Sequence, residues 1–168
     1  MDTTTIVLSS IIAILLAGFL AYIFWIQRRQ SVQAENGELS SVSGHPLQLQ
    51  AYERLILLAD RIAIPNLISR LNHPDLSARE MQLLLTQTIK QEFDHNITQQ
   101  IYVTAESWEA VKNLKEQTLL IINQLANTLA ITAKAYDLNK LLLEYLHTVD
   151  NMNDKVSALL SFNAKKVL

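Results

Sequence analysis

Two Glu-x-x-His motifs are the most suggestive chemical pattern in this sequence. They are Glu92-Phe93-Asp94-His95 and Glu144-Tyr145-Leu146-His147. Carboxylate-bridged di-iron bundles use two such motifs on two helices, and one inward-pointing Glu from each of two other helices completes the site. The order of this chain fits that plan, because its other helical stretches offer Glu53, Glu109 and Glu116. A metal site would require all these side chains to converge.

Helical geometry separates the two motifs. At about 100° per residue, Glu92 and His95 continue the apolar stripe of their helix, whereas Glu144 and His147 lie about 140° to 160° from the centre of theirs. The three other Glu side chains fall on polar faces. We therefore expect no metal site and keep a metal-binding or enzymatic pair, Glu92 and His95, as the alternative. The preferred interpretation is a partly buried polar pair, hydrogen-bonded to one or more of Asn96, Gln99, Gln100, Arg54 and Arg61.

The sequence offers little other chemistry. It contains no cysteine, which excludes a disulfide framework, a thiolate metal site and a thiol nucleophile. No nucleophile-elbow, P-loop, dinucleotide-binding, H-E-x-x-H or EF-hand pattern is present. From residue 46 onward, 12 Lys or Arg face 13 Asp or Glu. We therefore expect no catalytic activity, no cofactor and no nucleic-acid partner.

A membrane anchor is predicted near the N-terminus. Residues 6–26 are 21 consecutive uncharged residues, all apolar except Ser9, Ser10 and Gly18. With the preceding threonine they make a helix of about 33 Å, enough to span a bilayer once. The boundary is marked by Tyr22, Trp25, Arg28 and Arg29. With no Lys or Arg before the span and bulky residues after it, we expect an uncleaved, single-pass anchor. The positive-inside rule places the N-terminus outside and residues 30–168 in the cytoplasm.

Small residues recur every four positions along this span, at Ser9, Ala13, Ala17 and Ala21. Such a stripe lets a second helix approach closely, so one hypothesis is a homo-oligomer formed through the membrane helix. The alternative is that these residues are ordinary members of a spanning helix and pack against lipid.

The rest of the chain divides into a linker and an all-α domain. Residues 1–29 comprise the tail and anchor, residues 30–45 a flexible polar linker, and residues 46–168 a cytosolic helical domain. A flexible linker of 16 residues has a root-mean-square reach of about 20 to 24 Å. The apolar period of the domain is helical throughout, which predicts an up-and-down bundle of four to five helices.

Local signals give the expected elements. A first helix begins near Pro46 and ends or kinks at Pro65, followed by a short turn over residues 66–71. The second begins at the Ser77 and Glu80 capping box and runs to about residue 96, and residues 97–103 form an extended connection. The third covers about residues 105–130 with Thr104 as its cap, the fourth begins at an Asp137 cap, and the last covers residues 155–168 after a break at 151–154. In the fourth helix we expect Val149 among the inward side chains, and the last helix is an amphipathic stretch that carries Phe162.

Several strings in this domain resemble a family of uncharacterised, membrane-anchored helical proteins of Bacteroidota. They include the segments 49–55 (LQAYERL), 77–80 (SARE), 92–96 (EFDHN) and 99–103 (QQIYV), together with Trp108 and Lys112. The resemblance covers about residues 46–125. It implies a protein of the bacterial cytoplasmic membrane and supplies no activity, cofactor or catalytic residue.

Three functional hypotheses follow. The leading one is an anchored cytosolic module that binds another protein as a scaffold or accessory subunit. The second is a metal-binding or enzymatic bundle using Glu92 and His95. The third is an oligomeric membrane organiser acting through the small-residue stripe.

Overall fold

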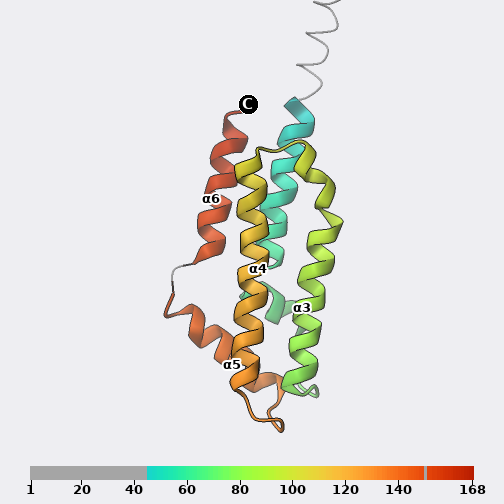
Figure 1. Cartoon of the computed structure of the whole chain (residues 1–168), viewed down its shortest axis with the longest axis vertical. Coiled ribbons are helices and arrows are strands. Elements are labelled where there is room, and N and C mark those ends of the chain that lie inside the picture. Colours follow the sequence, from blue (N-terminus) through green and yellow to red (C-terminus); the bar gives the residue numbers. More distant parts are fainter. Residues whose placement is uncertain (1–44, 150) are drawn as a thin grey trace, which may run out of the picture. The chain divides into compact units, whose positions relative to one another are not determined.

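The computed structural model describes residues 45–149 and 151–168, and every regular element in these ranges is helical (Figure 1). Residues 45–61 form the first described helix. It is followed by α2 (Ile64–Leu71), α3 (Ala78–His95), the 3₁₀ helix η1 (Ile97–Ile101), α4 (Ala105–Thr128), α5 (Ala135–Leu146) and α6 (Met152–Lys165). The predicted all-α class is confirmed for this part of the chain, with six α-helices instead of the four to five expected.

The additional helix is α2, which corrects the expected turn over residues 66–71. Pro65 occupies the first helical turn of α2, where its missing N–H needs no partner and its fixed φ favours a helical start. The same residue prevents the 45–61 helix from continuing through it. Ile64 and Leu67 of α2 are buried, so this short helix is held by the core.

Helix α3 begins at the predicted capping box. The Ser77 hydroxyl accepts from the Glu80 N–H at 3.3 Å, and the Glu80 carboxylate accepts from the Ser77 N–H at 2.9 Å. Residues 97–103, expected to be extended, contain η1 instead. The N–H groups of Gln99 and Tyr102 donate to carbonyls three residues earlier, and no strand in the described chain is available to pair with this segment.

Helix α4 begins at its predicted cap, because the Thr104 hydroxyl accepts from the Ser107 N–H at 3.2 Å. Two later boundaries differ from expectation. Asp137 lies one turn inside α5, where its carboxylate accepts from the Lys134 N–H at 2.8 Å. Residues 151–154 do not form a break throughout, since Asn151 caps α6 and the helix begins at the next residue.

The helices form four antiparallel columns (Figure 1). Helices α3 and α4 are continuous columns packed against each other. Helix 45–61 followed by α2 makes the first column, and α5 followed by α6 makes the last. Helix α4 packs against both α5 and α6, and α3 packs against α2 and α5. The fold is thus an up-and-down bundle in which the first and last columns are each broken into two helices.

One core joins the columns. Its largest fully buried side chains include Tyr52, Leu55, Leu58 and Ile62 of the first column, Met81, Leu85 and Ile89 of α3, Leu114 and Ile122 of α4, and Leu138 and Leu142 of α5. Val149, which was expected to face inward, is 39% exposed, and Phe162 of the amphipathic last helix is 59% exposed. Val149 follows the end of α5, and Phe162 lies against the Lys166 ammonium group at 4.1 Å.

No helix in residues 45–149 or 151–168 has the combination of length and apolar character that crossing a bilayer requires. The predicted span over residues 6–26 lies outside the described residues. The same is true of its boundary residues Tyr22, Trp25, Arg28 and Arg29, and of the stripe Ser9, Ala13, Ala17 and Ala21.

Candidate functional site

Glu92 is bound by two arginines. The Nε and Nη2 groups of Arg61 donate to Glu92 Oε1 at 2.8 and 2.5 Å, and Nη1 of Arg70 lies 3.4 Å from the same oxygen. Hydrogen bonding from Arg61 is the main cause that holds the pKa of Glu92 below its ordinary value, against the opposing effect of burial. Of the partners considered from the sequence, Arg61 is confirmed. This ion-pair cluster joins the 45–61 helix, α2 and α3.

His95 does not join Glu92. The buried side of α3 runs through Leu85, Ile89 and Phe93 at intervals of four residues, and His95 lies two residues, or about 200°, beyond Phe93. The expected partly buried pair is therefore wrong for His95, whose side chain is exposed.

The other residues of the di-metal pattern are also dispersed. All of them are exposed: Glu53 lies on the 45–61 helix, Glu109 and Glu116 on α4, Glu144 on α5, and His147 directly after α5. In the described residues, no three His, Cys, Asp or Glu side chains gather as a group that would hold a metal ion.

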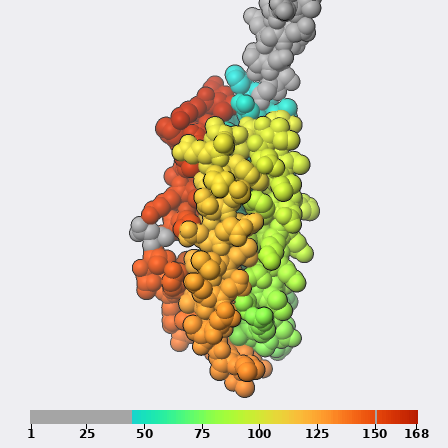
Figure 2. Space-filling model, viewed as in Figure 1, coloured from blue at the N-terminus to red at the C-terminus, as the bar shows by residue number. Residues whose placement is uncertain are grey.

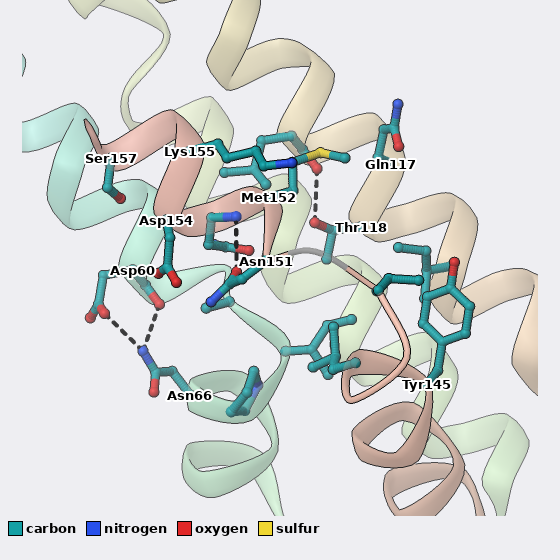
Figure 3. Close-up of a pocket in the computed structure, with 18 of the residues that line it drawn as sticks. Asp60, Asn66, Gln117, Thr118, Tyr145, Asn151, Met152, Asp154, Lys155 and Ser157 are labelled. Atoms are coloured by element: carbon teal, nitrogen blue, oxygen red, sulfur yellow. Dashed lines mark hydrogen bonds between the residues drawn. The ribbon is translucent and has the colours of Figure 1, made fainter. Parts of the chain in front are cut away.

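A cavity of about 700 Å³ lies where the two broken columns face α4 (Figure 3). Its walls come from residues between 60 and 66 at the first break, from residues between 143 and 149 and between 151 and 157 around the second break, and from the middle of α4. Its volume is within the range of small-molecule and peptide-side-chain pockets. We call this cavity the break pocket.

Three side chains make the first break possible. The last carbonyls of a helix have no partner within it, and an unpaired buried carbonyl is costly. Here Asn153 Nδ2 donates to the Ala59 carbonyl at 2.6 Å, Asn66 Nδ2 to the Asp60 carbonyl at 2.9 Å, and Arg70 Nη2 to the Arg61 carbonyl at 2.7 Å. Side chains from α2 and α6 thus donate to three successive carbonyls, and the Asp60 carbonyl also accepts from the Ala63 N–H at 3.2 Å, so the end of this helix is held by specific bonds.

The second break is closed by local bonds. The N–H groups of His147 and Thr148 donate to carbonyls three residues earlier, and the Asn151 side chain accepts from the Asn153 N–H at 3.1 Å. Because Asn153 also bonds to Ala59, the start of α6 is fixed to the end of the 45–61 helix. The two breaks therefore lie at the same level of the bundle.

The break pocket combines apolar and polar walls. Its apolar lining includes Ile64 and Pro65 of α2, Leu114 and Ile121 of α4, Leu146 of α5 and Met152 of α6. In the view of Figure 3, Asp60 and Asp154 are drawn on one side, and Gln117 and Tyr145 on the opposite side. His147 and Lys155 also line the pocket. Such a pocket suits an apolar group that carries a cation at one end, placed toward the two carboxylates.

Sequence reasoning missed this pocket. The signals for the two breaks were present, in Pro65 and in the polar run that ends at Asp154. The sequence does not show that the two breaks lie at the same level of the bundle, because the hydrogen bond that aligns them joins residues 94 positions apart.

A second, open depression lies between α3 and α4. At its base Gln82 Nε2 donates to Asn123 Oδ1 at 2.7 Å, and Arg79 Nη1 donates to Gln82 Oε1 at 2.6 Å. Leu83 and Leu120, both exposed, line it. Because Arg79, Gln82 and Asn123 bond to one another, these three side chains are less available to a ligand.

The comparisons with known proteins give one match. A model described as "Family of unknown function (DUF7935)" covers residues 1–167. Neither the curated proteins nor the solved structures include a match to this chain.

Proposed function

We propose that this chain, which belongs to the DUF7935 family, is a non-catalytic module that is anchored in a bacterial cytoplasmic membrane and binds another protein through the break pocket. It would act as a scaffold or accessory subunit on the cytosolic side. The observation that carries the proposal is the break pocket itself, a cavity of about 700 Å³ opened by two aligned helix breaks.

The construction of the pocket supports a binding role. In a bundle with four continuous columns, the backbone N–H and carbonyl groups in the middle of each column would bond to each other within one helix. This chain instead uses the side chains of Asn66, Arg70 and Asn153 to bond the carbonyls at a break. The middle of α4 forms one wall of the cavity, where the side chain of Ile121 is partly exposed. Apolar lining with a few polar groups at the rim is the usual composition of a binding site.

The lining also indicates the chemistry of the partner. We expect a protein segment that inserts an aliphatic or aromatic side chain toward Ile121, Leu146 and Met152, which are partly exposed. A neighbouring Lys or Arg would face the carboxylates of Asp60 and Asp154. Short segments with this composition are typical ligands of grooves between helices.

The anchoring part of the proposal rests on the sequence. The uncharged run over residues 6–26, the aromatic residues at its end and the two arginines that follow support a single span with residues 30–168 in the cytoplasm. The resemblance to membrane-anchored proteins of Bacteroidota agrees with that arrangement. Self-association through Ser9, Ala13, Ala17 and Ala21 is a separate hypothesis, tested by cross-linking of an Ala13→Leu, Ala17→Leu variant.

Site-specific photo-crosslinking tests the binding site. The full chain carries a photoreactive residue at Gln117, which lines the break pocket, and in a matched control at Gln124, seven residues along the same helix and outside the pocket. After irradiation of native cells, the cross-linked peptides are identified by mass spectrometry. We expect one defined protein segment, containing a basic residue beside an apolar one, at Gln117 alone.

Two results would overturn this proposal. Equal cross-linking of the same protein from both positions would show contact with the general surface of the bundle. Absence of a protein adduct from Gln117 would show that the pocket has no protein partner under native conditions. Elemental analysis of the same purified protein addresses the metal alternative, which no geometry in the described residues supports.

A further inference from the structure

One end of the bundle carries a group of exposed apolar side chains. It is formed by the first turns of the 45–61 helix, by η1 and the residues that join it to α4, and by the last turn of α6 and the C-terminus (Figure 1). We call it the η1 end. Its exposed apolar side chains are Leu47, Ile97, Ile101, Tyr102 and Leu168, of which Ile101 is 72% exposed.

The segments at the η1 end are held together by specific bonds. The Thr104 N–H donates to the Tyr52 hydroxyl at 3.2 Å, which fixes the start of α4 to the 45–61 helix. Asn163 Nδ2 donates to the Ser107 hydroxyl at 2.9 Å, which fixes the end of α6 to the start of α4. Figure 2 shows the corresponding parts of the surface gathered at the same end of the molecule. The exposed side chains therefore belong to one ordered surface.

We infer that the η1 end rests on the headgroup layer of the bilayer that anchors the chain. This inference depends on the membrane anchoring in the proposed function and does not depend on a partner in the break pocket. Exposed isoleucines gain free energy by leaving water, and a tyrosine ring is favoured at the membrane interface. Together these side chains provide an apolar contact of the kind that interfacial segments use.

The position of residue 45 indicates that the η1 end, and not the opposite end of the bundle, faces the bilayer. The described domain begins at the η1 end, 18 residues after the predicted span closes at Ile26. For a flexible chain of 18 residues the expected root-mean-square reach is about 21 to 25 Å. Helix α4 has 24 residues and so measures about 36 Å. Exposed side chains at the opposite end, such as Ile131, would meet the bilayer only if the linker were strongly stretched.

The charges at the η1 end indicate that the contact is mainly apolar. Lys165 and Lys166 near the C-terminus are accompanied by the exposed carboxylates of Asp94 and Glu106 on the neighbouring helix ends. Attraction to anionic headgroups requires a net excess of basic residues, which these four do not provide. We therefore expect docking on uncharged phosphatidylcholine that persists at high salt.

Docking would also set the height of the break pocket. The α4 residues that line it lie around Thr118, 13 residues from the first residue of the helix. This separation corresponds to about 20 Å along the helix axis. The pocket would therefore open to the cytosol at a fixed distance from the bilayer, within reach of a partner bound to the same membrane.

The absence of cysteine makes a fluorescence test direct. Full-length Ile101→Cys and Ile131→Cys variants, each labelled with an environment-sensitive fluorophore, are placed in phosphatidylcholine vesicles that contain a spin-labelled lipid quencher. Ile131 is fully exposed at the opposite end and is the matched control. We expect at least about twofold quenching at position 101 and none at position 131. Equal fluorescence at the two positions would overturn the docking.

A second variant separates docking from anchoring. The label is placed at Thr98→Cys, and Ile101→Glu with Tyr102→Glu is added to remove the apolar contact. Flotation of the vesicles measures anchoring in the same sample. We expect unchanged flotation with loss of quenching in the doubly substituted protein. Flotation with quenching that survives the substitutions would contradict the docking alone, whereas loss of flotation in the unsubstituted chain would contradict both docking and anchoring.

Discussion

The side-chain amide of Asn153 donates a hydrogen bond of 2.6 Å to the backbone carbonyl of Ala59, 94 residues earlier in the chain. Ala59 lies near the end of the 45–61 helix, and Asn153 lies in the first turn of α6. The bond therefore ties the break in the first column to the break in the last one. It explains how two unrelated interruptions come to line a single pocket.

Removing this bond should destabilise the domain. Asn153→Ala leaves the Ala59 carbonyl without its side-chain donor, at an expected cost of about 1 to 3 kcal/mol in the free energy of unfolding. Urea unfolding of the full chain in mild detergent measures this change. Asn127→Ala, at an exposed position of α4, controls for the difference in helix propensity between Asn and Ala. Equal effects of the two substitutions would refute a structural role for the Asn153 bond.

The ion-pair cluster predicts a dependence of stability on pH. The pKa of Glu92 is held below its ordinary value of 4.5, first by hydrogen bonding from Arg61, so the folded state favours the carboxylate. A carboxyl group whose pKa is lowered by folding stabilises the folded protein at pH values above its ordinary pKa. This stabilisation is lost as the pH falls through the lowered pKa. Glu92→Gln should therefore cost about 1 kcal/mol at neutral pH, because Arg61 and Arg70 are partly exposed and screened by water.

The measurement is the difference in unfolding free energy between the native protein and Glu92→Gln from neutral pH to below pH 4. We expect this difference to shrink toward the acid end. Glu144→Gln is the matched control, because Glu144 is exposed and its pair with Lys140 is longer, at 3.8 Å. A constant difference for Glu92→Gln across the pH range would contradict the assignment.

Asn139 of α5 offers a stabilising substitution. Its side chain is buried, its Nδ2 reaches Asn72 Oδ1 at 3.4 Å, and its Oδ1 has no hydrogen-bond partner among the described residues. Leucine has the same branching at Cγ and no polar atom, so Asn139→Leu removes the unsatisfied oxygen and should raise the free energy of unfolding by about 1 kcal/mol. Thermal unfolding compares it with Asn139→Ala, which should stabilise less because it leaves a void. A lower melting temperature for Asn139→Leu would show that the asparagine is required.

Local signals predicted the parts of the fold that local bonds determine. Ser77 and Thr104 begin α3 and α4 as expected, because a capping residue acts on N–H groups within three positions of itself. The all-helical class followed from the apolar period. Helix α2 was missed even though Ile64, Leu67, Ile68 and Leu71 follow helical spacing, because Pro65 was interpreted as an end and not also as a beginning.

Tertiary contacts decided the remaining features. The β-branched and aromatic residues of segment 97–103 favour an extended chain, but η1 forms with Gln99 buried. The arginine partner of Glu92 was foreseen, whereas the exposure of His95 depended on the exact rotation of α3 against its neighbours. Predicting the break pocket would have required the relative positions of two breaks that are distant in the sequence, and no local pattern contains this information.

The most direct test of the proposed function is to block the break pocket and measure partner binding. A photoreactive residue is placed at Ser157, on another wall of the pocket, and the yield of its protein adduct in native cells is compared for Gln117→Trp and Gln124→Trp. A bulky indole at the pocket rim should reduce the adduct by at least about tenfold, equivalent to about 1.4 kcal/mol, and the same substitution at Gln124 should leave it unchanged. Equal adduct yields in the two variants would contradict a partner-binding role for the break pocket.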